Sequence, residues 1–166
     1  MNIKRYIATI ILAIVLLLNF SCTDWLDVKP VDRMSEDQLY STEAGFRQAL
    51  NGIYVELNHA DLYGDELLVN TVEILAQRYK FSSMGTLTNQ YHLAEFDYTT
   101  DYAKKCGSRI WEKAYALIAN VNKLLKNADS HKDLFTGDSY DLITGEAYAL
   151  RAFLHFDLLR LFGPVY

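Results

Sequence analysis

The clearest alternation of apolar and polar residues lies near the end of the chain, between residues 139 and 162. This stretch stops at Gly163-Pro164, because proline cannot continue a helix and restricts the residue before it. At helical spacing two opposed stripes of the stretch are apolar. The first stripe has mostly large side chains and comprises Ile143, Ala147, Leu150, Leu154, Leu158 and Leu161. The opposite stripe has mostly small side chains and comprises Gly145, Ala149, Ala152 and Phe156. A helix that is apolar on two sides is typical of a buried helix, so we expect it in the middle of a helical stack.

Three further helices and one irregular segment precede it. Apolar residues spaced by three and four predict helices at 42–58, 65–79 and 108–128. Ser35 begins a capping box that predicts a short helical turn before the first of them. Residues 80–102 lose this periodicity and contain Gly85, several Ser and Thr residues, and five aromatic residues. The sequence therefore predicts an all-α fold, a tetratricopeptide-like helical stack with an irregular, aromatic-rich insertion.

The N-terminus has the layout of an export signal. Lys4 and Arg5 precede an almost wholly apolar run at 7–20, and a small residue and Cys22 follow. The run of about 14 residues is short for a membrane span, which needs ~20. A cysteine in this place indicates a bacterial lipoprotein, in which the Cys22 thiol takes a lipid; the alternative is an uncleaved anchor with an idle thiol. We expect three parts: a signal peptide at 1–21, an extended arm at 22–34 and a helical domain at 35–166.

Charge and composition argue against several functions. The chain carries 16 basic and 21 acidic side chains, and beyond Lys104-Lys105 it has no basic cluster, so nucleic-acid binding has little support. No two of the four histidines have metal-ligand spacing, and no catalytic or phosphate-binding motif is present. We therefore expect no enzyme, no metal and no cofactor. Cys106 is expected to be a buried small apolar residue, and Asp157 and Arg160 to form a salt bridge.

The irregular segment holds the candidate binding residues. Exposed aromatic rings can stack on the apolar faces of sugars, while carboxylate and amide side chains bond sugar hydroxyls. On this basis the candidates are Tyr91, Phe96, Tyr98 and Asp101. The alternative for each aromatic residue is a role in the core or in anchoring a loop.

Several segments, in order along the chain, resemble the SusD/RagB family of outer-membrane lipoproteins. These are DWLDVKP after Cys22, GFRQALNGIY at 45–54, IW at 110–111 with IANVN at 118–122, GEAYALRAFLHFD at 145–157 and RLFGPV at 160–165. The block at 145–157 is the most specific of them.

The resemblance implies a surface-exposed, lipid-anchored glycan-binding protein of the cell outer membrane. Such a protein captures oligosaccharide or polysaccharide for a SusC-like TonB-dependent transporter and is not an enzyme. The alternative is a membrane-anchored, tetratricopeptide-like adaptor that recognises another protein. Family members are several hundred residues long, so the chain is expected to be the N-terminal portion of such a protein.

Overall fold

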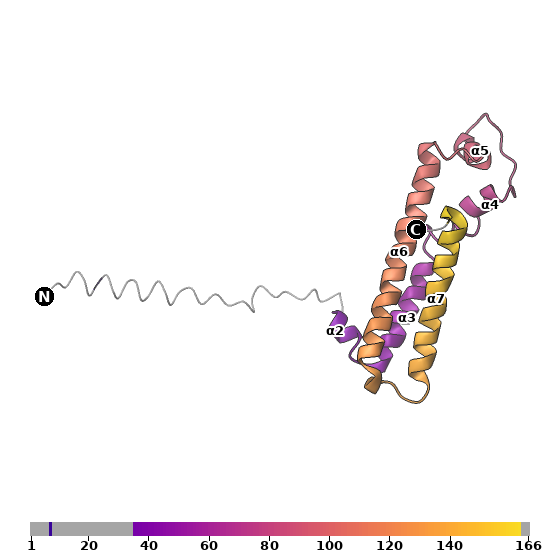
Figure 1. Ribbon diagram of the computed structural model, residues 1–166. Coiled ribbons are helices and arrows are strands. Elements are labelled where there is room, and N and C mark those ends of the chain that lie inside the picture. The colour runs from indigo at the N-terminus through magenta and orange to yellow at the C-terminus, as the bar shows by residue number, and fades with distance from the viewer. Residues whose placement is uncertain (1–6, 8–34, 164–166) are drawn as a thin grey trace. The chain divides into compact units, whose positions relative to one another are not determined.

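The computed structural model describes residue 7 and residues 35–163 (Figure 1). The Cys22 prediction and the predicted signal peptide and arm, apart from residue 7, lie outside these residues. The described part is helical and contains no strand, which confirms the all-α prediction. Its elements are α2 (Glu36–Leu39), α3 (Glu43–Leu57), α4 (Thr71–Leu75), α5 (Thr88–Ala94), α6 (Asp101–Ser130), the 3-10 helix η2 (Lys132–Leu134) and α7 (Ser139–Phe162).

A bundle of three helices forms the core. In Figure 1 α3, α6 and α7 lie side by side, with α6 running opposite to the other two. Their facing stripes bury one continuous apolar cluster, in which Phe46, Val121, Leu124 and Ala147 have no exposed surface. Burial of this apolar area is the main force that holds the three helices together.

Side-chain caps set where the helices begin. The Thr42 hydroxyl accepts a hydrogen bond from the backbone N–H of Gly45 at 3.1 Å, and the Thr100 hydroxyl accepts one from Ala103 at 3.2 Å. These bonds satisfy N–H groups that lack a partner in the first turn. The predicted capping box at Ser35 is present and starts α2. The first predicted helix, 42–58, corresponds closely to α3.

The predicted helix at 65–79 is wrong over most of its length. Only α4 is helical there, and turns precede it. The carbonyl oxygen of Asp65 accepts hydrogen bonds from three successive N–H groups, those of residues 68, 69 and 70, so the regular ladder does not form. Gln77, with φ of 59°, follows α4. Most apolar residues of this segment therefore lie in a folded loop, although their spacing is that of a helix.

The segment at 80–102 is less irregular than predicted. It contains α5, and α6 begins at Asp101 and not at 108. The Thr100 cap explains the earlier start. Gly107 lies inside α6, where glycine lowers helix stability by about 1 kcal/mol without ending the helix.

Helix α7 is buried on one side only. Its large stripe is buried apart from the partly exposed Leu161, as predicted. The opposite stripe is exposed, so the prediction of a helix covered on both sides is wrong for the described residues. The reason is that α3 and α6 both pack against the large stripe. None of the described helices is both long and apolar enough to span a membrane.

Candidate functional site

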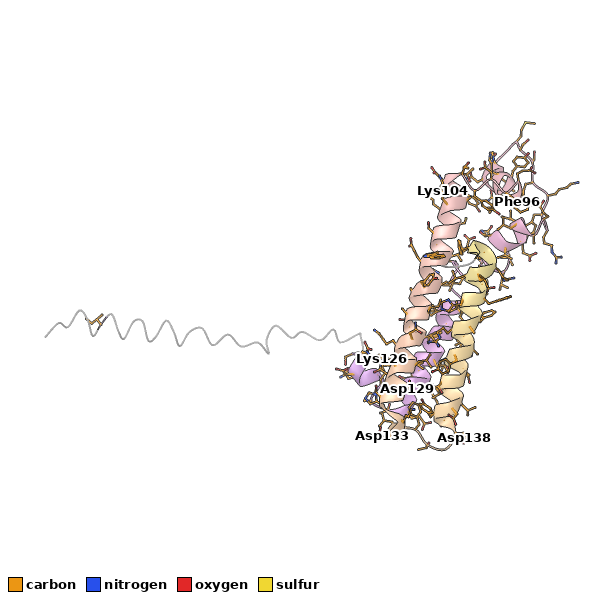
Figure 2. All side chains as sticks on the ribbon, viewed as in Figure 1. Phe96, Lys104, Lys126, Asp129, Asp133 and Asp138 are labelled. Carbon is orange, nitrogen blue, oxygen red and sulfur yellow. The ribbon has the colours of Figure 1, made fainter. Side chains whose placement is uncertain are left out.

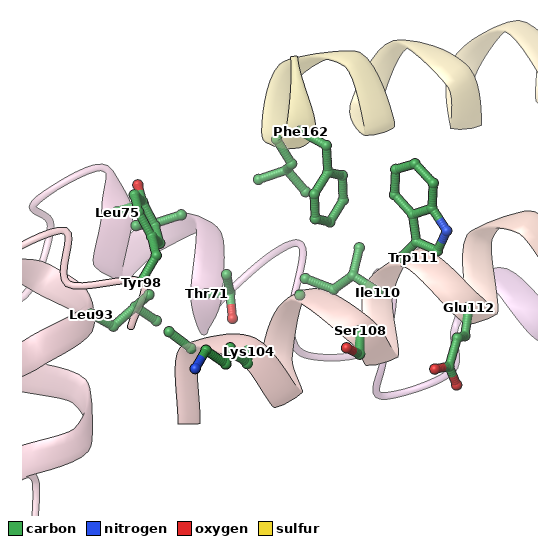
Figure 3. A pocket seen from close by; sticks show the side chains of 13 residues that line it. Thr71, Leu75, Leu93, Tyr98, Lys104, Ser108, Ile110, Trp111, Glu112 and Phe162 are labelled. Atoms are coloured by element: carbon green, nitrogen blue, oxygen red, sulfur yellow. The ribbon is translucent and has the colours of Figure 1, made fainter. Parts of the chain in front are cut away.

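A groove lies at one end of the bundle, where α4, α5, the first turns of α6 and the last turn of α7 meet. Its volume is about 630 Å³. Figure 3 shows the side chains that line it, drawn from all four helices and from the segment that joins α5 to α6. Three of them are aromatic and four are polar: Tyr98, Trp111 and Phe162, and Thr71, Lys104, Ser108 and Glu112.

The aromatic side chains form two separate surfaces in the groove. Trp111 and Phe162 meet edge to face, with ring centroids 5.1 Å apart and an interplanar angle of 88°. The Phe162 ring lies over Gly107, since a Cβ built on this glycine would be in van der Waals contact with the ring at 3.6 Å. Tyr98 lines the groove from the α5 side (Figure 3). Exposed fractions of 37% for Trp111, 40% for Phe162 and 58% for Tyr98 leave ring surface free for a ligand.

Polar side chains follow one edge of the groove along α6. Lys104, Ser108 and Glu112 are spaced by four residues, so they lie one above another on the same helix face. The same three side chains also line a second groove of about 450 Å³, which includes Asp101 and Arg109. The edge between the two grooves therefore offers an ammonium, a hydroxyl and a carboxylate to a hydroxyl-rich ligand.

A buried carboxylate fixes the wall that α4 contributes. Glu66 is 2% exposed and accepts hydrogen bonds from the Thr71 hydroxyl and from the Arg109 guanidinium. Arg109 also lies 3.7 Å from a carboxylate oxygen of Asp61. These contacts join the turns before α4 to α6, so Thr71 is held at the groove. Burial, together with nearby Cys106 and Glu66, raises the pKa of Tyr102 beside this cluster to about 12.

A second buried carboxylate holds the end of α7. Asp157 accepts hydrogen bonds from the Tyr63 hydroxyl and from Nε of Arg160, the latter at 2.8 Å. The predicted Asp157–Arg160 salt bridge is thus present. Burial and the Asp157 carboxylate raise the pKa of the Tyr63 phenol. The Tyr63 ring also stacks on Phe153 at 5.0 Å, so the turn region at 59–70 clamps the part of α7 that precedes Phe162.

The structure separates the four predicted binding residues. Tyr98 lines the first groove and Asp101 the second, and Lys104 lines both grooves. Tyr91 and Phe96 line neither groove. The half-buried Tyr91 meets the His92 ring edge to face, and Phe96 is exposed with φ of 59°, close to the end of the molecule where Figure 2 labels it.

Two aromatic side chains of the groove were not among the sequence candidates. Trp111 belongs by spacing to the apolar stripe of α6 and Phe162 closes α7, so both match a core pattern. The sequence feature that could have identified them as groove residues is their position at the same end of two neighbouring antiparallel helices. Cys106 is buried, as predicted. Within the described part of the chain no three His, Cys, Asp or Glu side chains are grouped so that they could hold a metal ion.

Comparison with known proteins places this arrangement in a family. Two curated proteins of Formosa agariphila are similar to this chain. SusD-like protein P2 is 27% identical over 162 residues, which are 98% of this chain and 30% of that relative. SusD-like protein P25 is 27% identical over 148 residues, which are 87% of this chain and 28% of that relative. The chain thus spans less than a third of the length of these relatives. No solved structure matches significantly. The SusD-like family model, described as "Starch-binding associating with outer membrane", matches residues 24–166, which include the whole bundle and the groove. The chain therefore belongs to the SusD-like family.

Proposed function

We propose that the chain is part of a glycan-binding lipoprotein of the outer membrane and that the groove beside Trp111 takes an oligosaccharide. The protein is attached through a lipid on Cys22 and faces the outside of the cell. It captures glycan without chemical conversion and passes it to a SusC-like TonB-dependent transporter. The family match and the aromatic groove support this function together.

The single observation that carries the proposal is the composition of the groove. A volume of about 630 Å³ lies within the ~300–1,000 Å³ typical of small-ligand sites. Trp111, Phe162 and Tyr98 present flat apolar rings, and the C–H faces of a sugar ring are flat and apolar as well. Lys104, Ser108 and Glu112 supply both donors and acceptors beside these rings, which suits ring hydroxyls.

Tryptophan fluorescence tests the site directly. The chain has two tryptophans, so Trp25→Phe leaves Trp111 as the only one. The full chain in mild detergent is titrated with starch-derived oligosaccharides and with a panel of other glycans. Binding is expected to change Trp111 emission in a saturable way for at least one glycan. The absence of any response across the panel contradicts the proposed site.

Substitution separates the groove from the rest of the surface. Trp111→Ala is expected to remove most glycan binding, measured by calorimetry, while the circular dichroism spectrum is unchanged because the side chain is partly exposed. The matched control is Tyr148→Ala, which removes an exposed aromatic ring of α7 that does not line the groove. Equal affinity of Trp111→Ala and wild type contradicts the assignment.

Two further measurements test the anchor and the transporter. Radioactive palmitate is expected to label the wild-type chain and not Cys22→Ala, and equal labelling contradicts a lipid at this residue. Copurification with a barrel transporter is expected to depend on the added glycan and on Trp111. If it depends on neither, the adaptor function is favoured over glycan capture.

A further inference from the structure

One loop contacts two walls of the groove that lines Trp111. The loop consists of residues 58–70, which join the end of α3 to the start of α4. The α4 wall is the helix that carries Thr71, and the α7 wall is the last turn of α7 with Phe162 (Figure 3). The loop holds the α4 wall through Glu66 and the α7 wall through Tyr63. Only two residues separate these contacts in the sequence, so a very short piece of backbone connects the two walls.

The loop between the two contacts is compact. Leu62 and Leu67 are buried in the apolar core of the bundle. The backbone N–H of Leu67 donates to the carbonyl oxygen of Leu62 at 2.8 Å. Gly64 allows this close fold, since a Cβ there would lie 2.4 Å from the carbonyl oxygen of Asn58. Core packing and backbone hydrogen bonds thus make the loop one unit, so its two contacts do not move freely of each other.

Each contact includes a buried carboxylate, which makes it selective for one geometry. Glu66 is 2% exposed and Asp157 is 5% exposed. Apolar burial is non-directional, so by itself it does not fix where one helix end lies along another. A buried carboxylate needs hydrogen bonds in particular directions, because the protein interior solvates its charge poorly. The bonds from Arg109 and Tyr63 therefore favour one arrangement of the walls over its close alternatives.

We propose that the loop couples the α4 wall and the α7 wall into one unit, and that Tyr63 and Glu66 are positioning residues for the ligand of the groove. The inference rests on the proposed function for the identity of that ligand. Tyr63 lines neither groove, so it acts on binding through Asp157 and the end of α7. A ligand that contacts both walls binds more tightly when they are already held in place, because binding then does not have to order them.

Amide hydrogen exchange measures the coupling without a ligand. The amide of Ile74 reports on the α4 wall, where it donates to the carbonyl oxygen of Asn70 at 2.9 Å. The amide of Leu161 lies in the last turn of α7 and reports on the α7 wall. Local opening of a wall exposes its amide and lets it exchange with solvent. Both rates are followed by NMR on the full chain in mild detergent.

Two substitutions each loosen one contact. Tyr63→Phe removes the hydroxyl and keeps the stacked ring, and it is expected to speed exchange at Leu161 about tenfold, as for a lost hydrogen bond to a charged group. Because the loop connects the walls, exchange at Ile74 is expected to rise about threefold or more as well. Arg109→Met is expected to give the reverse pattern, with the larger rise at Ile74 and the smaller one at Leu161.

Tyr54→Phe is the matched control. The Tyr54 hydroxyl donates to a carboxylate oxygen of Glu146 at 3.1 Å, so it joins α3 to α7 outside the loop. This variant is expected to leave exchange at both amides at the wild-type rate. If Tyr63→Phe does not fold, Asp157→Asn takes its place, because it keeps the shape of the side chain and weakens the same contact by removing the charge.

Glycan binding separates failure of this inference from failure of the proposed function. Where the wild-type chain binds an oligosaccharide, Tyr63→Phe is expected to weaken binding about threefold to tenfold, and the bound glycan is expected to slow exchange at both amides. If no glycan binds while both variants speed exchange on both walls, the proposed function fails and the coupling stands. Exchange that rises only on the substituted wall, or on neither wall, overturns the coupling. Equal glycan affinity of Tyr63→Phe and wild type overturns the positioning role.

Discussion

Replacing Arg109 by Met tests how the buried carboxylate of Glu66 is stabilised. The change keeps most of the apolar stem of the side chain but removes the charge that pairs with Glu66. Glu66 is 2% exposed and would keep only the Thr71 hydroxyl as a side-chain donor. A buried carboxylate without its counter-charge is costly, since the protein interior solvates it poorly.

The magnitude follows from the burial of the two partners. Loss of one partner of a fully buried pair costs about 3–5 kcal/mol. The Arg109 side chain is 50% exposed, so water screens its charge and roughly half of that cost is expected, about 1.5–2.5 kcal/mol. With a urea dependence of about 2 kcal/mol per molar, the unfolding midpoint falls by roughly 1 M.

Urea unfolding of the full chain at neutral pH, followed by far-ultraviolet circular dichroism, measures this difference. The control is Arg78→Met, because Arg78 is 72% exposed and lies 3.8 Å from Glu73 on the surface. Its midpoint is expected to match that of wild type. Equal midpoints for Arg109→Met and Arg78→Met would refute the reasoning, because Arg109 would then give the buried Glu66 carboxylate no net stabilisation.

Two other predictions concern α3. Hydrogen bonds from Ser139 and Thr136 lower the pKa of Glu43 from 4.5 to about 2. Because this pKa is lowered on folding, the contribution of Glu43 to the stability of the folded state is complete above pH 4.5 and is lost as the pH falls toward 2. Titration by NMR is expected to show the low pKa, and Thr136→Val is expected to raise it; an unchanged value contradicts this. Gly52→Ala is expected to raise the free energy of unfolding by about 1 kcal/mol, because the site is open and alanine favours helix. Gly45→Ala is expected to lower the free energy of unfolding, because a Cβ there would lie 1.6 Å from a carbonyl oxygen of α2. Thermal melts in which both variants shift the melting temperature in the same direction would contradict this.

The sequence predicts correctly the helices in which buried apolar residues recur regularly on one face. The large stripe of α7 and the stripe of α3 from Phe46 to Ile53 are long enough for helical periodicity to identify the buried side. The same reasoning fails at 65–79, because the helical spacing there includes residues that pack from turns. It missed the buried Glu66, which is paired with Arg109, 43 residues away in the sequence.

The binding residues are harder to predict than the helices. Tyr98 and Asp101 come from the segment that the composition identified, and each lines one of the two grooves that share Lys104. Trp111 and Phe162 match core positions by spacing, and their exposure depends on how far each helix extends. Local patterns do not contain that information, because it depends on the relative ends of two packed helices.

The unequal lengths of α6 and α7 explain why the groove forms at this end of the bundle. Helix α6 has 30 residues and α7 has 24, so α6 is longer by about 9 Å. Since the last turn of α7 brings Phe162 over Gly107, the first turns of α6 extend beyond α7 and carry Lys104. Helices α4 and α5 lie at that end, as Figure 1 shows, and leave a groove between themselves and the end of α7. The Thr100 cap and the clamp of Tyr63 on Asp157 thus set its geometry, because one fixes where α6 begins and the other holds the part of α7 that carries Phe162. A rigid bundle in this way positions loop residues such as Tyr98 for binding.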